Sequence, residues 1–178
     1  MDSTTNQPTL LGPVPLPFND AIAAGDTPAV DPGLMEEYGS IISSLPSNPK
    51  MHLNCYQEVP GIIAIQRRGG GGFTPRRRGD VVLASPPKCG TTWLKALAFA
   101  TMARRAHPPA AADGVQHPLL RLNPHDCVPF MEKLFAAGLG SKMDALPSPR
   151  PMATHMHHSL LPTSITDNLD CKIIYICR

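Results

Sequence analysis

Short apolar runs, separated by polar and proline-rich stretches, are the main hydrophobic pattern along the chain. Residues 81–84 ("VVLA") and 173–177 ("IIYIC") are continuously apolar, with no polar residue at alternate positions. Continuous apolar runs bounded by glycine or proline are typical of strands buried on both faces of a parallel sheet. The two runs therefore predict buried strands, and residues 151–156 ("PMATHM") predict a further strand.

A helix is predicted directly after the first strand, over residues 91–106 ("TTWLKALAFATMARRA"). Apolar residues recur in it at helical spacing, at Leu94, Leu97, Ala98 and Met102. Arg104 and Arg105 favour the C-terminal end of that helix, where the helix dipole attracts positive charge. Strand, tight loop and helix together form the opening of an α/β unit.

Weaker patterns predict four other elements. An amphipathic helix is predicted over Leu34–Leu45, and residues 59–66 ("VPGIIAIQ") form an apolar element of either type. Residues 127–140 predict a short helix that ends at a glycine, with Phe130, Leu134 and Phe135 facing inward. Residues 161–170 predict a helical turn that begins at a proline.

Two stretches carry no such periodicity. Residues 1–32, rich in proline, alanine, threonine and aspartate, predict a flexible tail, which leaves 33–178 as one domain. Residues 67–78 hold four consecutive glycines flanked by arginines. An arginine–glycine contact to nucleic acid is the alternative for this stretch. A disordered, solvated loop is favoured, because the run occurs once and Phe73 is its only aromatic residue.

Composition and charge are those of a soluble globular protein, with 42% hydrophobic and 17% charged residues among 178. A net charge of +2 is too small to indicate nucleic acid or a membrane as partner. No apolar run approaches the roughly 18–20 residues of a membrane span, and the N-terminus lacks a signal-peptide pattern. None of the five cysteines forms a Cys-x-x-Cys pair, which favours free thiols. We therefore expect a cytoplasmic protein; the pattern does not indicate its oligomeric state.

The candidate chemistry lies between the first strand and the helix, in "PPKCGTTW" at 86–93. Gly90 permits a close backbone approach, and the N–H groups that follow have no helical partner, so they can donate to an anion. Thr91 and Thr92 add hydroxyls, and Lys88 adds a mobile positive charge. The loop is therefore predicted to bind phosphate.

The order of residues separates this loop from that of nucleotide triphosphatases. Their pattern places the lysine after the second glycine, whereas Lys88 precedes Gly90. There is no upstream glycine at the required spacing, and no partner acid for magnesium stands out. The sequence thus predicts a phosphate site without a metal.

"PKCGTTWL" resembles the P-K-[SX]-G-T-T-W-L signature of the cytosolic sulfotransferases, especially those of plants. Three later segments resemble the same family in the same order, namely "NPHDCVPFMEKLF", "RPMATHMHHSLLP" and "CKIIYICR". The resemblance covers about residues 50 to 178 and implies an α/β three-layer sandwich with a central parallel sheet and a P-loop-like strand–loop–helix. Family members continue well beyond the position of Arg178, so we expect a domain that is incomplete at its C-terminus.

The resemblance also implies an activity. The family transfers a sulfuryl group from 3′-phosphoadenosine 5′-phosphosulfate (PAPS) to a hydroxyl of a small acceptor, such as a phenol, flavonoid, steroid-like molecule or other alcohol. The site residues that it implies are Lys88 at the leaving group, Cys89, Gly90, Thr91 and Thr92 in the 5′-phosphate loop, Trp93 near the adenine, Phe130 in the acceptor pocket, His155 as general base and Arg178 at the 3′-phosphate.

The chemistry of the reaction agrees with these roles. Sulfuryl transfer resembles phosphoryl transfer, in which negative charge builds on the leaving oxygen, and a lysine there stabilises the transition state. A histidine with an ordinary pKa near 6.5 can accept the proton of the acceptor hydroxyl at neutral pH.

Several alternatives stand beside this interpretation. A metal-binding tract is the alternative for His155, His157 and His158, but strand alternation would turn His158 away. His125 is interpreted as a loop or capping residue, and Trp93, taken alone, as a core aromatic. The alternative functions are a truncated, inactive family member that at most binds the nucleotide, and a small-molecule kinase.

Overall fold

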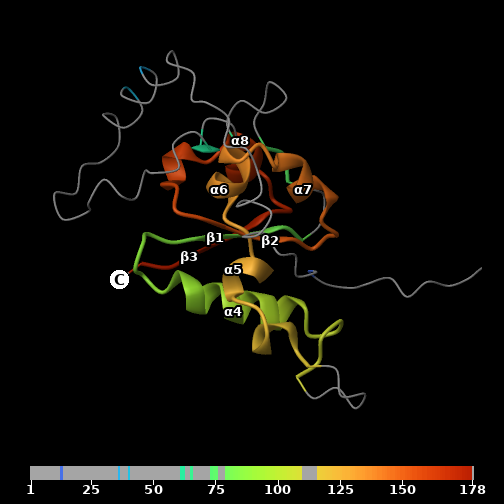
Figure 1. Ribbon diagram of the computed structural model, residues 1–178. Coiled ribbons are helices and arrows are strands. Elements are labelled where there is room, and N and C mark those ends of the chain that lie inside the picture. Colours follow the sequence, from blue (N-terminus) through green and yellow to red (C-terminus); the bar gives the residue numbers. More distant parts are fainter. Residues whose placement is uncertain are drawn as a thin grey trace, which may run out of the picture.

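The computed structural model describes residues 79–109 and 116–177, together with Pro13, Glu36, Ser40, Gly61, Ile62, Ile65 and residues 73–75. In these ranges, groups of helical segments separate three short strands (Figure 1). These elements are β1 (Val81–Ala84), α4 (Thr91–Met102), η3 (Pro118–Leu120), α5 (Pro124–Cys127), α6 (Met131–Ala136), α7 (Gly140–Ala145), β2 (Pro151–Thr154), η4 (His158–Leu160), α8 (Thr163–Thr166) and β3 (Lys172–Tyr175). The three strands predicted from the sequence are therefore confirmed.

The strands form one parallel sheet of order β2-β1-β3, with β1 in the middle. In its register Val82 lies opposite Met152 of β2 and Ile173 of β3. Parallel neighbours need crossover connections, and the helices between the strands supply them. The carboxyl ends of all three strands consequently lie at the same edge of the sheet.

Helices cover both faces of the sheet, as Figure 1 shows, with α6, α7 and α8 on one side and α4 and α5 on the other. Side chains alternate between the two faces along each strand. Val82 and Met152 pack with Met131, Leu134 and Met143 of α6 and α7. Leu83 and Ala153 pack with Phe99 of α4 and Cys127 of α5. The predicted three-layer α/β sandwich is confirmed.

The buried residues of α4 are not the apolar residues that recur in it at helical spacing. Thr91, Lys95 and Phe99 are buried, whereas Leu97 is 62% exposed. Leu94 and Ala98 are only partly buried, at the margin of the core. Apolar spacing alone assigns Lys95 to solvent, whereas the fold surrounds this lysine with polar and aromatic partners.

The helix also ends earlier than predicted, at Met102 with Ala103 as its C-cap. Arg104 and Arg105 therefore lie in the turn beyond it, exposed to solvent. The ends of helices are the part that sequence patterns locate least well.

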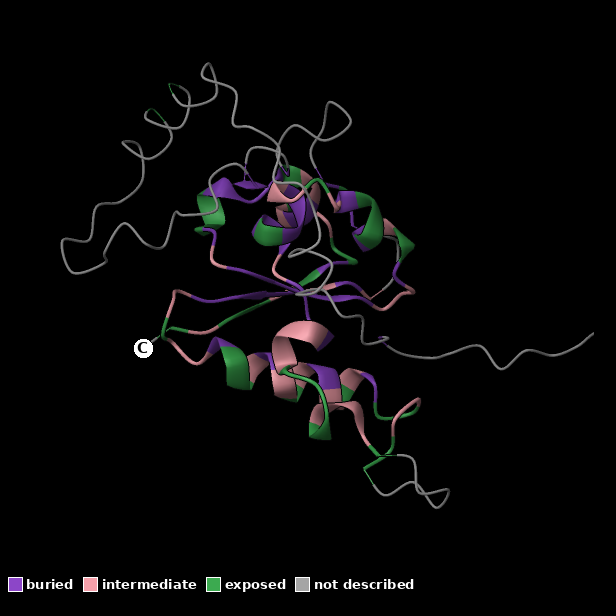
Figure 2. Cartoon of the chain, viewed as in Figure 1, coloured by how far each residue is buried: buried purple, intermediate pink, exposed green. Residues whose placement is uncertain are grey.

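The burial predicted for the last strand is not found. Ile174 is 45% exposed and Tyr175 is 62% exposed, and Figure 2 shows β3 largely in the colours of accessible residues. β3 lies at the edge of the sheet, and α4 packs against β1 and β2 instead. Within the described ranges, no second strand pairs with the outer edge of β3.

Two predicted helices are confirmed. The helix predicted within 127–140 is α6, which Gly138 follows at a φ of +68°. The helical turn predicted to begin at a proline is α8, with Pro162 as its N-cap.

Upstream of residue 73, the helix predicted over 34–45 is described only at Glu36 and Ser40, both helical. Gly61, Ile62 and Ile65 are helical, so the apolar element there is a helix at these positions. Ile62 and Ile65 are buried in the core.

Most of the stretch at 67–78 and, apart from Pro13, the predicted tail at 1–32 lie outside the described residues. Phe73 is described, and its buried ring packs edge-on against Phe135 with 5.7 Å between centroids. The division into a tail and one domain stays a prediction. No helix among the described residues is long and apolar enough to cross a membrane.

A fully buried ion pair joins the beginnings of β1 and β2. Asp80 and Arg150 are both inaccessible to solvent, and Arg150 Nε lies 3.1 Å from one Asp80 carboxylate oxygen and 3.2 Å from the other. The guanidinium also donates to the carbonyl of Met143 at 2.8 Å. Each charge is thus matched by several hydrogen bonds, which offsets much of the cost of burying it.

We expect Arg150→Met to lower the free energy of unfolding by about 3–5 kcal/mol, because it leaves the Asp80 carboxylate buried without its partner. Urea denaturation measures the change. Arg104→Met removes an exposed arginine and serves as the control, with an effect within about 0.5 kcal/mol. Equal effects of the two substitutions would contradict the structural importance of the pair.

Candidate functional site

The predicted phosphate loop connects β1 to α4 in an unusual backbone conformation. Lys88 has a φ of +65° and Gly90, the N-cap of α4, has a φ of +98°. A side chain rarely adopts such torsions, so glycine is favoured at position 90. A Cβ placed there would meet no atom within 4 Å, so the space in front of the loop is open. The first N–H groups of α4 face this region without helical acceptors.

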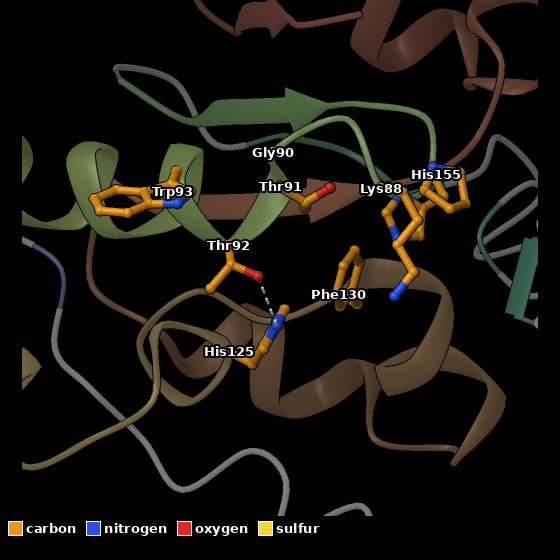
Figure 3. Close-up of a pocket in the computed structure, with 9 residues that line it drawn as sticks. Lys88, Gly90, Thr91, Thr92, Trp93, His125, Phe130 and His155 are labelled. Atoms are coloured by element: carbon orange, nitrogen blue, oxygen red, sulfur yellow. Dashed lines mark hydrogen bonds between the residues drawn. The ribbon is translucent and has the colours of Figure 1, made fainter. Parts of the chain in front are cut away.

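The two threonines of the loop, Thr91 and Thr92, have different hydrogen-bond partners. The hydroxyl of Thr91 lies 2.6 Å from the hydroxyl of Ser85 in a buried contact that ties the loop to the end of β1. The hydroxyl of Thr92 faces His125, at 3.4 Å from Nε2 (Figure 3). Thr92 is exposed and Thr91 is buried, so the second threonine is the more accessible donor.

An open cavity of about 390 Å³ lies beside the loop. It is lined by Pro87, Lys88, Gly90, Thr91, Thr92, Trp93, His125, Phe130 and His155. Pro87 and His155, which are 68 positions apart in the sequence (155 − 87), therefore lie in the wall of the same cavity. Figure 3 shows Lys88 and His155 toward one end of the group, and Thr92 and His125 toward the other.

Of the other residues proposed from the sequence, Trp93 lines this cavity, whereas Cys89 does not. Cys89 is half-buried, and its backbone N–H donates to the carbonyl of Pro86. Trp93 is 76% exposed and points away from Lys88 and His155, so it is not the core aromatic that its residue type alone indicated. Arg178 lies outside the described residues.

His155 follows β2 directly and is held in one orientation. Its Nδ1 lies 2.6 Å from the carbonyl oxygen of Ser85. A carbonyl only accepts hydrogen bonds, so Nδ1 carries the proton and Nε2 is the basic nitrogen. The ring also packs against Phe130, with 4.6 Å between centroids.

Glu132 of α6 supports the backbone at this point. It is buried, and its Oε1 accepts from the backbone N–H of His155 at 2.5 Å and from the hydroxyl of Thr154 at 2.8 Å. Glu132 was not predicted as a site residue, because a charged residue in a short amphipathic helix is expected to be exposed. Its one sequence signal is its place within the segment that resembles the family.

Lys95 is a second buried charge that the sequence analysis missed. It is wholly inaccessible, with Nζ 3.0 Å from Nδ1 of His125 and 3.3 Å from the centroid of the Phe130 ring. Burial lowers the pKa of Lys95 to about 6, against a smaller opposing effect of the Glu132 carboxylate. Burial thus disfavours the charged form of the amine.

His125 lies in α5 and in the cavity wall. Burial, followed by the nearby Lys95 and Lys133, lowers the pKa of His125 to about 4. The expectation of a loop or capping residue was wrong, because the side chain that caps α5 belongs to Asn123, which accepts from the backbone N–H of His125.

His157 and His158 do not join His155 in the cavity. Both are exposed, and His157 caps η4 by accepting from the backbone of Ser159. The alternation expected for these histidines does not apply, because β2 ends at Thr154. Among the described residues, no group of three or more metal-ligating side chains is placed to hold an ion.

The arrangement places groups that favour an anion beside a basic nitrogen. The helix N-terminus, the Thr92 hydroxyl and Lys88 all favour negative charge, while His155 presents a basic nitrogen to the same cavity. Such a site is suited to transfer of an anionic group to an acceptor that must lose a proton.

Comparison with known proteins agrees with this chemistry. A family model described as the sulfotransferase domain matches residues 78–178, which is more than half of the chain. The chain belongs to the sulfotransferase family. Cytosolic sulfotransferase 12 of Arabidopsis thaliana is 38% identical over 153 residues, which cover 83% of this chain and 46% of that protein.

Two other proteins show the same relationship. The flavonol 3-sulfotransferase of Flaveria bidentis is 44% identical over 99 residues, covering 56% of this chain and 29% of that protein. A crystal structure of an Arabidopsis thaliana putative steroid sulphotransferase aligns with a TM-score of 0.60 and 36% identity, covering 84% of this chain and 54% of the other. This sulfotransferase-family chain thus spans about half the length of the relatives it matches, or less.

We expect Gly90→Ala to cost about 1–2 kcal/mol of stability, because alanine is strained at a positive φ. The added methyl group also enters the space in front of the loop, so protection of the fold by inorganic phosphate should fall. Thermal unfolding with and without phosphate measures both effects.

Gly138→Ala is the matched control, since Gly138 also has a positive φ and open space around it but lies outside the cavity. It should lose similar stability and keep the response to phosphate. A phosphate response that is equal in the two variants would argue against an anion site at the loop.

Proposed function

We propose that this chain carries the donor-binding half of a PAPS-dependent sulfotransferase that acts on a hydroxyl of a small acceptor. The observation that carries the proposal is the shared cavity of Lys88, the phosphate loop and His155, whose basic Nε2 is set by the bond from Nδ1 to Ser85. Family membership supports the same reaction class.

The loop fits the 5′-phosphate of the donor. Open space in front of Gly90 leaves room for a phosphate against the first N–H groups of α4, and Thr92 adds a hydroxyl. Cys89 contributes loop backbone, and the exposed ring of Trp93 is accessible for stacking on the adenine. Arg178 is proposed to bind the 3′-phosphate from the resemblance alone.

In the proposed reaction, Nε2 of His155 accepts the proton of the acceptor hydroxyl as its oxygen attacks sulfur. A new S–O bond forms to the acceptor, and the S–O bond to the 5′-phosphate breaks, so that its electron pair stays on the phosphate oxygen. Lys88 stabilises the charge that develops there. The products are a sulfate ester and adenosine 3′,5′-bisphosphate, and no metal takes part.

The acceptor is proposed to be a phenol, a flavonoid or a similar small alcohol. The ring of Phe130 lies between His125 and His155 in the cavity wall, with centroids 5.5 Å and 4.6 Å away, and offers an aromatic surface beside the base. One relative is named a flavonol 3-sulfotransferase. Relatives are also named cytosolic, which supports a cytoplasmic location.

We expect His155→Ala to reduce sulfuryl transfer by about 10²–10⁴-fold, the usual contribution of a general base. Lys88→Ala should reduce it by a similar factor of about 10²–10³, because the leaving group loses its electrostatic partner. Formation of adenosine 3′,5′-bisphosphate from PAPS, with a panel of phenols and flavonols as acceptors, measures the rate.

His158→Ala and Lys142→Ala are the controls, since both side chains are exposed and outside the cavity. Full activity of the Lys88→Ala, His155→Ala double variant would refute the mechanism. Binding of the bisphosphate without any turnover by the 178-residue chain would instead support the inactive, nucleotide-binding alternative.

A further inference from the structure

Three side chains form a line from the interior of the molecule to the phosphate loop. Lys95 Nζ lies 3.0 Å from Nδ1 of His125, and Nε2 of the same imidazole lies 3.4 Å from the hydroxyl oxygen of Thr92. Lys95 and Thr92 are three positions apart on α4 and therefore share a side of that helix. His125 reaches them from α5, and Figure 3 shows its ring directed at Thr92.

The direction of these bonds depends on which atom of each pair carries the hydrogen, and therefore on the tautomer of His125. The Lys95 amine also lies over the face of Phe130, which attracts N–H groups but is a poor hydrogen-bond acceptor. The amine nitrogen carries hydrogens in either protonation state, so it can donate to an unprotonated Nδ1; only a neutral amine has a lone pair with which to accept from Nδ1. A neutral imidazole that accepts at Nδ1 carries its proton on Nε2, and Nε2 therefore donates to Thr92.

The neutral state of His125 is essential to this direction. A protonated imidazole would carry hydrogen on both nitrogens and could not accept from Lys95. Burial is the largest cause that holds the pKa of His125 near 4; the neighbouring Lys95 and Lys133 lower it further, and Asp126 opposes them. At neutral pH the ring is consequently uncharged and free to accept at Nδ1.

We propose that Lys95 and His125 are positioning residues that turn the Thr92 hydroxyl into a hydrogen-bond donor toward the phosphate of the bound nucleotide. A hydroxyl whose oxygen accepts from His125 keeps its single hydrogen for another acceptor. Without that partner, a threonine in the first turn of a helix can donate to backbone or water instead. The inference rests on the proposed function only for the identity of the phosphate. The direction of the hydrogen bonds from Lys95 through His125 to Thr92 does not depend on it.

The direction can be measured without any ligand. Long-range ¹⁵N–¹H spectra of the histidine rings distinguish the two neutral tautomers, and we expect His125 in the unmodified chain to carry its proton on Nε2. Assignment comes from the His125→Gln variant, in which that signal is missing. A proton on Nδ1 of His125, or a doubly protonated ring at pH 7, would overturn the inference.

The consequence for binding is tested by calorimetric titration with adenosine 3′,5′-bisphosphate. Lys95→Met, His125→Leu and Thr92→Val should each weaken binding by about tenfold, the effect of one lost hydrogen bond to a charged group. His125→Gln should stay within about threefold of the unmodified chain, since its amide can also donate toward Thr92. Loss of binding in His125→Gln equal to that in His125→Leu would count against positioning by donation.

A double variant separates positioning from general electrostatics. Because Lys95 acts through Thr92, Lys95→Met combined with Thr92→Val should cost about tenfold in total instead of about a hundredfold. Lys133→Met removes an exposed positive charge near Phe130 without interrupting the line, and it should change binding by less than about threefold. Additive losses in the double variant would overturn the proposal.

Failure of the proposed function gives a different result from failure of this inference. If the unmodified chain binds no bisphosphate, the nucleotide assignment fails, and the tautomer of His125 still decides the direction of the hydrogen bonds. If the chain binds the bisphosphate but His125 carries its proton on Nδ1, the function stands and the positioning role is refuted.

Discussion

The buried ion pair between Asp80 and Arg150 is the interaction on which the geometry of the site depends. These residues directly precede β1 and β2, and the register that follows pairs Val81 with Pro151 and Ala84 with Thr154. The next step brings Ser85 level with His155, where the carbonyl of the first meets Nδ1 of the second. A slip of one residue would reverse the faces of every side chain on β2 and separate these two groups. The Asp80–Arg150 pair at the start of the strands thus helps to set the position of His155 at their carboxyl ends.

Buried polar groups recur where the helices meet the carboxyl edge of the sheet. Lys95, Glu132 and the Ser85–Thr91 hydroxyl pair lie in or beside the cavity wall and are withdrawn from solvent. Each could be replaced by an apolar residue at lower desolvation cost, so packing alone does not explain them. Their common feature is a contact with a residue that lines the cavity: His125, His155 or Thr91. We infer that these buried polar groups serve to orient the residues that line the cavity.

The two histidines that line the cavity, His125 and His155, have different hydrogen-bond partners at Nδ1. Nδ1 of His155 faces a carbonyl, which leaves Nε2 as an acceptor. Nδ1 of His125 faces an amine, which on the proposed direction of the bonds leaves Nε2 as a donor. Opposite tautomers then stand at the two ends of one cavity, with the ring of Phe130 between them. An acceptor nitrogen is suited to removing a proton, and a donor nitrogen is suited to supporting an anion.

The local features could be predicted from the order of residues along the chain. Apolar runs located all three strands, and the order of Lys88, Gly90 and the two threonines indicated a phosphate loop and the family. The sequence did not predict the surroundings of individual side chains. It missed the exposure of β3, the burial of Lys95 and Glu132, and the position of His125 in the cavity wall. These depend on which segments lie next to one another, and residues 23 to 70 positions apart set the hydrogen-bond partners here. Burial and partners decide protonation and tautomer, so only the tertiary structure could assign them.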